Sequence, residues 1–386
     1  MFKIAERCNL ACSYCYFFFG GDDSFNRHPA IVAPQTVESI ATFLEQAIDE
    51  LDIGFIEVAL HGGEPLLMKK RAFEDLCIRL ARCGSEKCKI ILAVQSNGVL
   101  IDEEWIDILG RNHVRIGLSI DGTKEQHDAF RVDKKGRGTY DQTVAAWWRL
   151  KAAAREGRIG EPGLLSVIGP DTRHDVLSTF VADLDVTRLN FLLPDFTHDT
   201  CPYSEQEIAQ IGELMVAVLD DWRRIANPKL RVKFIHDALM PMVNAEGLAR
   251  AHAFKENLWP YVTISSDGGV HIEDTLRSAL WTQEAPYDVR QHSMREILAA
   301  DLWTEIAEGA ESRAPQCATC RYASICKGGP MLTRHSKANG FANASIYCAA
   351  LYRFHSALED RLVAASRLHP AFTAASLAQA ALEPAE

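Results

Sequence analysis

The order of apolar and polar residues predicts alternating strands and helices over the first part of the chain. Short apolar runs rich in branched side chains are typical of buried strands, and they cover 2–5, 55–60, 89–94, 115–120, 164–168 and 188–193. Apolar residues with helical spacing predict amphipathic helices at 36–51, 71–83, 103–111, 143–157, 175–184 and from 205 to about 225. We therefore expect an α/β fold with a parallel sheet under helices, either curled into a partial barrel or open and doubly wound.

The pattern changes in the second part of the chain. The stretch YVTISSDGGVHIED at 261–274 predicts a hairpin in which Asp-Gly-Gly forms the turn, and 345–365 predicts a helix. A chain of 386 residues also exceeds the usual size of one hydrophobic core. We expect an α/β domain, a bridging region, a cysteine-bearing domain and a flexible tail, at 1–226, 227–258, 259–366 and 367–386 respectively.

Charge and composition exclude several classes of protein. The net charge is −11 and no basic run exists, which disfavours a nucleic-acid partner. No apolar run reaches membrane-spanning length, and we find no export signal, so we expect a cytoplasmic protein. Eleven cysteines in such a protein indicate metal or redox chemistry and not disulfides.

A first group of cysteines follows the first predicted strand directly. Cys8, Cys12 and Cys15 lie within eight residues, and a loop can wrap three such thiolates around one metal centre. Soft thiolate ligands favour zinc or an iron–sulfur cluster, and three ligands leave one position open for reaction. Zinc completed by a distant residue such as His28 or His61 remains the alternative. Tyr14, between the second and third cysteines, can line a cofactor pocket.

The sequence His61-Gly62-Gly63-Glu64-Pro65 ends the second predicted strand. In parallel α/β folds, ligands bind at the carboxyl ends of the strands. The two glycines allow the backbone to approach a ligand closely, and Glu64 can accept a hydrogen bond from an ammonium group. A tight turn without any ligand is the alternative interpretation.

A second group of cysteines lies near the end of the chain. Cys317, Cys320, Cys326 and Cys348 supply four thiolates, enough to close a metal site completely. Their spacing fits either a fully ligated iron–sulfur cluster or a structural zinc. Cys77 is interpreted as a buried thiol, and no role is assigned to the other cysteines, Cys83, Cys88 and Cys201.

The segments CNLACSYC and HGGEP resemble the signatures of the radical S-adenosylmethionine (radical SAM) superfamily. The resemblance implies a partial (β/α)6 barrel related to the TIM barrel. It also implies that Cys8, Cys12 and Cys15 hold a [4Fe-4S] cluster whose fourth iron binds S-adenosylmethionine. Gly62, Gly63 and Glu64 would contact the methionine amino group of that cofactor.

Two later segments extend this resemblance. QSNG at 95–98 ends the third predicted strand, and GLSIDGTKEQHDAFR begins within the fourth. The match implies cofactor contacts for Ser96, for Ser119 on the ribose side, and for Arg131 at the carboxylate. For Arg131 alone, a surface salt bridge would be the simpler interpretation.

The C-terminal cysteines resemble the SPASM domain of peptide-modifying radical enzymes, which carries auxiliary [4Fe-4S] clusters. This chain departs from the pattern, because Pro330 stands where another cysteine is usual and Glu273 replaces the cysteine of the preceding hairpin. We therefore expect one SAM-binding cluster and one auxiliary cluster, the latter on the four cysteines from Cys317 to Cys348.

The segments KIAERCNLACSYCYFF, DGGVHIEDTLRSA and KGGPMLTRHSKANGFANASIYCAAL resemble maturases that form three-residue cyclophanes in ribosomally made peptides. The resemblance implies removal of a Cβ hydrogen from a precursor peptide by a 5′-deoxyadenosyl radical, then a crosslink from Cβ to an aromatic carbon. It also implies an external electron donor such as flavodoxin or ferredoxin. Asp274 is a candidate to accept the proton or orient the peptide, with turn stabilisation as the alternative.

Two alternatives remain open for the function. One is another peptide or protein modification on the same scaffold, such as thioether formation or oxidation of a sulfatase serine or cysteine to formylglycine. The other is a protein without catalytic activity, either an iron–sulfur electron carrier or a zinc-binding scaffold.

Overall fold

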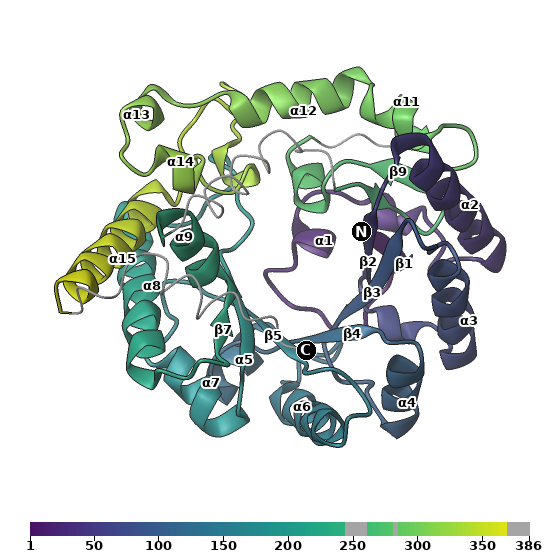
Figure 1. Cartoon of the computed structure of the whole chain (residues 1–386), viewed down its shortest axis with the longest axis horizontal. Helices are drawn as coiled ribbons and strands as arrows, with labels where there is room; N and C mark the ends of the chain where they lie inside the picture. Colours follow the sequence, from purple (N-terminus) through teal and green to yellow (C-terminus); the bar gives the residue numbers. More distant parts are fainter. Residues whose placement is uncertain (244–260, 281–284, 369–386) are drawn as a thin grey trace. The chain divides into compact units, whose positions relative to one another are not determined.

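A computed structural model describes residues 1–243, 261–280 and 285–368 of the chain (Figure 1). The chain divides into two compact units, each made of two separate stretches of sequence. The first unit contains 1–165 and 259–307, and the second contains 166–258 and 308–386. The sequence analysis predicts domains that follow one another along the chain, whereas each of these units combines two separate stretches. The two divisions are not equivalent, so the domain boundaries stay a prediction. The predicted tail at 367–386 lies almost wholly outside the described residues.

The sheet of the first unit is built on parallel strands, as the apolar runs predict. Its strand order is β10-β9-β8-β1-β2-β3-β4-β5. The parallel strands are β1 (Phe2–Ala5), β2 (Phe55–Gly62), β3 (Lys89–Ser96), β4 (Arg115–Ser119) and β5 (Gly163–Val167). Because these strands are parallel, β1 to β4 direct their carboxyl ends, and the loops that follow them, toward one edge of the sheet.

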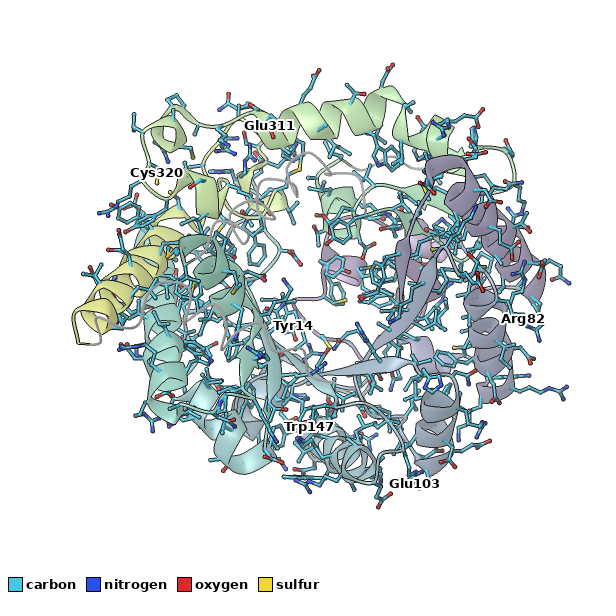
Figure 2. The ribbon with its side chains drawn as sticks, viewed as in Figure 1. Tyr14, Arg82, Glu103, Trp147, Glu311 and Cys320 are labelled. Carbon is cyan, nitrogen blue, oxygen red and sulfur yellow. The ribbon has the colours of Figure 1, made fainter. Side chains whose placement is uncertain are left out.

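Helices join these strands and pack beside one another in chain order. They are α2 (Pro34–Leu51), α3 (Lys70–Ala81), α4 (Glu103–Arg111) and α6 (Tyr140–Arg155). Figure 1 shows α2, α3 and α4 along one side of the strands, and Figure 2 places Arg82 and Glu103 at the outer surface. Asp102 accepts a hydrogen bond from the N–H of Trp105 and so fixes the start of α4.

The core of the first unit lies between these helices and the sheet. Leu60 and Leu118 on the strands are fully buried, as are Phe73 on α3 and Trp147 on α6. The rings of Phe73 and Trp105 meet edge to face at 5.1 Å between centroids. Burying side chains of this size supplies about 1.5–3 kcal/mol each, and this hydrophobic layer is what holds the strand ends in place.

A small antiparallel extension borders β1. Strand β8 (Thr263–Ile264) lies parallel to β1, and β9 (Gly269–His271) and β10 (Tyr287–Asp288) continue the sheet in antiparallel order. The predicted hairpin is therefore confirmed as β8 and β9. The short helix η3 (Asp274–Ser278) follows β9 directly, which brings residues from 271–278 beside the first strand.

The second unit consists mainly of helices around two short strands. Its strands are β6 (Arg188–Leu192) and β7 (Arg231–Val232), and its longer helices are α7 (Val176–Leu184), α8 (Glu205–Ile225), α9 (Lys233–Val243) and α15 (Cys348–Leu368). Helices α8 and α15 pack side by side (Figure 1), with ion pairs at 2.7 Å from Arg353 to Glu213 and at 2.9 Å from Arg361 to Asp220.

Short elements precede α15 in the second unit. They are α13 (Pro315–Ala318), α14 (Ala323–Cys326) and η4 (Leu332–Arg334), while α12 (Asp301–Glu311) carries the chain from the first unit into the second. Within the described ranges, none of the helices is long and apolar enough to cross a membrane.

Candidate functional site

The first three cysteines lie on a loop that begins where β1 ends. Cys15 is the N-cap residue of the short helix α1 (Tyr16–Phe19), and the N–H of Leu10 donates to the sulfur of Cys8 at 3.3 Å. The loop is fixed to the segment after α5 (Lys124–Phe130), because the N–H of Ala11 donates to the carbonyl of Val132 at 2.8 Å. All three thiols are partly exposed.

The structure brings these three thiols together. Burial raises the pKa of Cys8 to about 12, and the neighbouring charges of Glu64, Cys12 and Cys15 raise it further. A free thiol in this environment is therefore not a thiolate at neutral pH. Cationic metal atoms would remove this obstacle, since coordination stabilises the deprotonated form of the ligand.

The two glycines at the end of β2, Gly62 and Gly63, are required by the backbone of the cysteine loop. A Cβ atom on Gly62 would lie 2.0 Å from the carbonyl oxygen of Ala5, and one on Gly63 would lie 2.3 Å from that of Arg7. Gly62 also has a φ of +138°. The N–H groups of Gly63 and Glu64 donate to these same two carbonyls, each at 2.8 Å. The glycines therefore hold the loop against the end of β2.

Glu64 is buried and joins the ends of two strands. Its carboxylate accepts hydrogen bonds from the N–H of Leu66 at 3.0 Å, from the hydroxyl of Ser96 at 2.9 Å and from the N–H of Asn97 at 2.8 Å. Burial raises the pKa of Glu64 to about 7, although these three donors oppose the shift. The carboxyl group is thus occupied by the protein itself, and its predicted contact with a cofactor amino group stays a prediction.

Ser96 and Ser119 lie at the ends of neighbouring strands and differ in their surroundings. The Ser96 hydroxyl is turned toward Glu64, whereas the Ser119 hydroxyl accepts a hydrogen bond from the side-chain amide of Gln95 at 2.9 Å. Sequence analysis missed Asn97, whose side-chain amide donates to Asn9 at 2.8 Å and to the sulfur of Cys8 at 3.8 Å. Its position within QSNG was the signal available.

Arg131 belongs to a buried cluster at the cysteine loop. Its Nε donates to the carboxylate of Asp121 at 2.7 Å, and its guanidinium lies 5.4 Å from the ring centroid of Tyr14, a residue labelled in Figure 2. The Tyr14 hydroxyl donates to the same carboxylate of Asp121. Arg131 is only 7% exposed, so the simple surface salt bridge is wrong for this residue. Asp121 orients both predicted cofactor residues and was itself missed.

Asp274 is the first residue of η3 and is almost completely buried. Its Oδ2 accepts from the Nζ of Lys3 at 2.5 Å and from the Tyr16 hydroxyl, while Arg277 lies 3.8 Å from Oδ1. Burial alone would raise the pKa of Asp274, but the neighbouring charges, led by Lys3, lower it well below its usual range. The carboxylate is therefore a weak proton acceptor.

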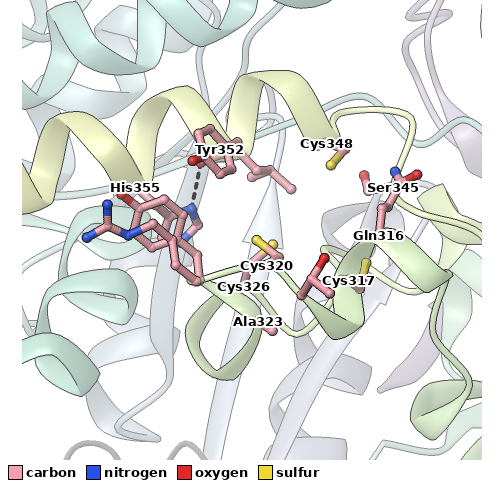
Figure 3. A pocket seen from close by; sticks show the side chains of 14 residues that line it. Gln316, Cys317, Cys320, Ala323, Cys326, Ser345, Cys348, Tyr352 and His355 are labelled. Carbon is pink, nitrogen blue, oxygen red and sulfur yellow. Dashed lines mark hydrogen bonds between the residues drawn. The ribbon is translucent and has the colours of Figure 1, made fainter.

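The four C-terminal cysteines line one cavity of about 360 Å³ in the second unit. Figure 3 shows their sulfur atoms facing a shared space between the start of α15 and the α13–α14 segment. The cavity also includes the aromatic rings of Tyr322 and Tyr352. Burial raises the pKa of Cys326 to about 11, so this thiol too would need a cationic partner in order to ionise.

The chemistry of both sites fits iron–sulfur clusters. Among the described residues, no three His, Cys, Asp or Glu side chains converge closely enough to hold a single metal ion. In a [4Fe-4S] cluster each thiolate binds a different iron atom, so the sulfurs stand farther apart than around one zinc ion. The three grouped thiols of the first unit match a cluster with one iron atom open to another ligand. The four thiols of the second unit match a cluster in which every iron atom is bound by the protein.

Two comparisons with known proteins concern the whole chain. It is 24% identical over 363 residues to a cysteine-type anaerobic sulfatase-maturating enzyme of Clostridium perfringens, covering 92% of this chain and 94% of that one. The solved structure of native anSMEcpe with bound AdoMet superposes with a TM-score of 0.76 at 21% identity, over 95% of this chain and 98% of the other.

Other similarities are weaker or shorter. The structure of Streptococcus suis SuiB bound to precursor peptide SuiA gives a TM-score of 0.62 at 18% identity, covering 90% of this chain and 74% of SuiB. A serine-type anaerobic sulfatase-maturating enzyme of Bacteroides thetaiotaomicron is 30% identical over 133 residues, which are 34% of this chain and 31% of that enzyme.

A family model carries the identification. The model of the radical SAM superfamily matches residues 2–179, which include the cysteine loop, the HGGEP segment and Arg131. Together with the α/β fold, this match shows that residues 2–179 carry the radical SAM enzyme signature, and enzymes of this class use S-adenosylmethionine and a [4Fe-4S] cluster.

Proposed function

We propose that this enzyme modifies a ribosomally made precursor peptide by forming a crosslink between a Cβ atom and an aromatic carbon. One observation carries the proposal. Among the described residues, four of the eight cysteines outside the cysteine loop line one cavity, and the hairpin position that usually bears another cluster ligand holds Glu273. A single auxiliary cluster would distinguish this chain from SPASM domains that carry two auxiliary clusters, and this difference supports similarity to the cyclophane-forming maturases.

Cys8, Cys12 and Cys15 would hold the reactive cluster, and Cys317, Cys320, Cys326 and Cys348 the auxiliary one. When bound and reduced by an external donor such as flavodoxin or ferredoxin, the reactive cluster and S-adenosylmethionine would supply the 5′-deoxyadenosyl radical. Gly62 and Gly63 position the cysteine loop, Glu64 holds Ser96, and Asp121 holds Arg131 and Tyr14. These residues fix the geometry in which a peptide Cβ hydrogen can be removed.

The atoms balance as a loss of two hydrogens from the peptide. One leaves as a hydrogen atom, which converts the radical to 5′-deoxyadenosine. The other leaves the aromatic ring as a proton and an electron after the new carbon–carbon bond has formed. When bound by its four cysteines, the auxiliary cluster would supply the one-electron acceptor.

Asp274 fits an orienting role better than a proton-accepting one. Its carboxylate is charge-paired with Lys3 and hydrogen-bonded to Tyr16, the residue that follows Cys15. A group with so low a pKa takes up a proton poorly at neutral pH. The network instead ties η3 to the cysteine loop, which supports a role in orientation.

Sulfatase maturation is the second candidate, and the similarity over nearly the whole length of the Clostridium perfringens enzyme favours it. In that reaction, a peptide cysteine or serine would become formylglycine. Conversion of serine also removes two hydrogens, so a change of mass cannot by itself distinguish this product from a crosslink.

The deciding experiment uses the reconstituted enzyme under reducing, anaerobic conditions with two peptides. One is a precursor with an aromatic-x-x tripeptide near its end, and the other is a sulfatase-derived peptide with the target cysteine or serine. We expect the first to lose two hydrogens, to resist fragmentation within the tripeptide and not to react with a hydrazide. A hydrazide-reactive product from the second peptide alone would contradict crosslinking and support sulfatase maturation.

The control for both peptides is the Cys12→Ala variant. It should release no 5′-deoxyadenosine and modify neither peptide, because the reactive cluster would lose one of its three thiolates. Modification by this variant would contradict the assignment of the cysteine loop.

A further inference from the structure

Arg334, the last residue of η4, is a buried cation that the proposed reaction does not use. It is 2% exposed, and the described residues give its guanidinium no carboxylate within ion-pair distance. A buried charge normally has a charged partner, because removing an ion from water costs several kcal/mol. This arginine therefore requires an explanation.

Backbone carbonyls accept most of the hydrogen bonds of the Arg334 guanidinium. The two terminal nitrogens of Arg334 donate to the carbonyls of Ala310 at 3.1 Å, Gly309 and Phe341 at 2.9 Å, and Ser312. Three of these acceptors lie at or just beyond the last turn of α12, where the helix dipole is negative. This clamp fixes the position of the guanidinium but supplies no full negative charge.

One donor of Arg334 remains without an acceptor and lies beside the loop of Cys326. The buried Nε–H has no hydrogen-bond partner. A Cβ atom placed on Gly328 would lie 3.5 Å from this Nε, so the arginine side chain lies next to the loop. The N–H of Gly328 in turn donates to the thiol of Cys326. Gly328 therefore lies between the guanidinium of Arg334 and Cys326, a proposed cluster ligand.

The loop after Cys326 directs one N–H group at the cysteine sulfur. Lys327, Gly328 and Gly329 have φ values of +54°, +86° and +84°. The N–H groups of Lys327 and Gly329 donate to the carbonyls of Ala323 and Cys326, whereas that of Gly328 donates to the Cys326 sulfur. Burial and then Arg313 lower the pKa of Arg334, whereas the charges of Cys317, Glu311 and Cys326 act in the opposite direction. Arginine nevertheless keeps its charge in proteins.

We propose that Arg334 sets the reduction potential of the auxiliary cluster, by placing a fixed positive charge against the Cys326 loop. Four thiolates and a [4Fe-4S] core carry net negative charge, which increases when an electron is added. A buried cation stabilises the reduced form more than the oxidised form and so raises the potential. A higher potential makes the cluster a better electron acceptor, the task given to it in the proposed function on which this inference rests.

The test measures the auxiliary cluster alone. Full-length protein with Cys8, Cys12 and Cys15 replaced by alanine is reconstituted anaerobically, and the midpoint potential is determined by a redox titration followed by electron paramagnetic resonance. In this background we expect Arg334→Gln to lower the potential clearly, and Arg334→Lys to keep it close to that of the parent. Arg361→Gln is the matched control, because it removes a positive charge from a partly exposed pair with Asp220 on the same unit and should leave the potential unchanged.

The outcomes separate this inference from the proposed function. A parent that binds zinc or no iron would overturn the proposed auxiliary cluster itself. A loaded R334Q protein with the potential of the parent would overturn the tuning role and leave the cluster in place. If R334Q does not load, R334K decides the question: a potential close to the parent supports a charge effect, and a clearly lowered potential overturns it.

Discussion

The Nζ atom of Lys3 lies 2.5 Å from Oδ2 of Asp274, and the two side chains are 0% and 2% exposed. The pair joins β1 to η3 immediately beside the cysteine loop. Lys3 also lies 3.3 Å from Nδ1 of His61 and 4.2 Å from the ring centroid of Phe17. A buried pair of this kind places strict limits on what can replace either partner.

Replacement of Asp274 by asparagine should destabilise the protein strongly. The change leaves the charge of Lys3 buried without its partner, and breaking such a pair costs about 3–5 kcal/mol. Chemical denaturation of the cluster-free protein measures this loss. Asp141→Asn is the control, since its pair with Lys124 is exposed and should contribute at most about 1 kcal/mol. Equal losses of unfolding free energy in both variants would contradict the expected contribution of the buried pair of Lys3 and Asp274.

The same variant tests the catalytic assignment of Asp274. If Asp274 orients the peptide or accepts a proton, D274N enzyme with intact clusters should show reduced crosslinking per 5′-deoxyadenosine released. Unchanged coupling between cofactor cleavage and crosslinking would remove Asp274 from the mechanism and leave it a structural residue.

Gly62→Ala should disrupt the first site by two separate effects. Its Cβ would meet the carbonyl of Ala5 at 2.0 Å, and a φ of +138° is strained for alanine, so we expect a loss of about 3 kcal/mol or more. Gly136→Ala separates the two effects, because Gly136 has a φ of +76° and a Cβ added there would have nothing within 4 Å. The control should lose only about 1 kcal/mol.

Cofactor loading should also differ between these two variants. Gly136→Ala is expected to bind as much iron as the parent, whereas Gly62→Ala is expected to lose the share held by the cysteine loop. Normal iron content in a folded Gly62→Ala protein would show that the close contact with Ala5 is dispensable.

Stability of the cluster-free protein should fall as the pH is lowered from about 6.5. Burial lowers the pKa of His127 to about 4 and that of His271 to about 3, while both titrate near 6.5 when unfolded. Above pH 6.5 neither state binds the extra proton. Below it the unfolded state gains protons that the folded state does not, which costs up to about 1.4 kcal/mol per pH unit for each histidine.

Urea denaturation at pH 7, 6 and 5 measures this slope. His271→Gln should reduce the slope by roughly one proton, because glutamine does not titrate. If the unfolding free energy depends on pH with the same slope in the variant and the parent, His271 is not held uncharged in the folded protein.

Anaerobic reconstitution should load about eight iron atoms per chain, four for each of two clusters. Replacement of Cys317 and Cys320 by alanine should reduce this number to about four, and Cys77→Ala should leave it unchanged because Cys77 is a buried thiol of α3. About twelve iron atoms, or zinc in place of iron at the second site, would contradict the two-cluster assignment.

Local signals explain why much of the fold could be predicted. Helices α4 and α8 have the bounds that the sequence indicated, and Asp102 and Ser204 fix where they begin by capping their first turns. The Asp-Gly-Gly turn likewise places β8 and β9. The short helix α5 was missed although Thr123 and Gln126 form a capping box, since it lacks a long apolar stripe.

The candidate site was predicted in its ligands but not in its supporting residues. Cysteines and glycines carry signals in their spacing, so both cysteine groups and the HGGEP segment could be found. The partners that orient them are distant in sequence: Lys3 meets Asp274 and Tyr14 meets Asp121 through folding alone. Charged residues with such partners resemble ordinary surface residues until the chain has folded.

The pairing of Lys3 with Asp274 also sets an order of events during synthesis. A ribosome produces the two residues 271 positions apart, which takes on the order of tens of seconds. Through that interval β1 can join β2, but its lysine cannot find its carboxylate. The first unit thus becomes complete only after residues 166–258 have been synthesised, and a nascent chain arrested before β8 should present β1 as an open sheet edge to chaperones.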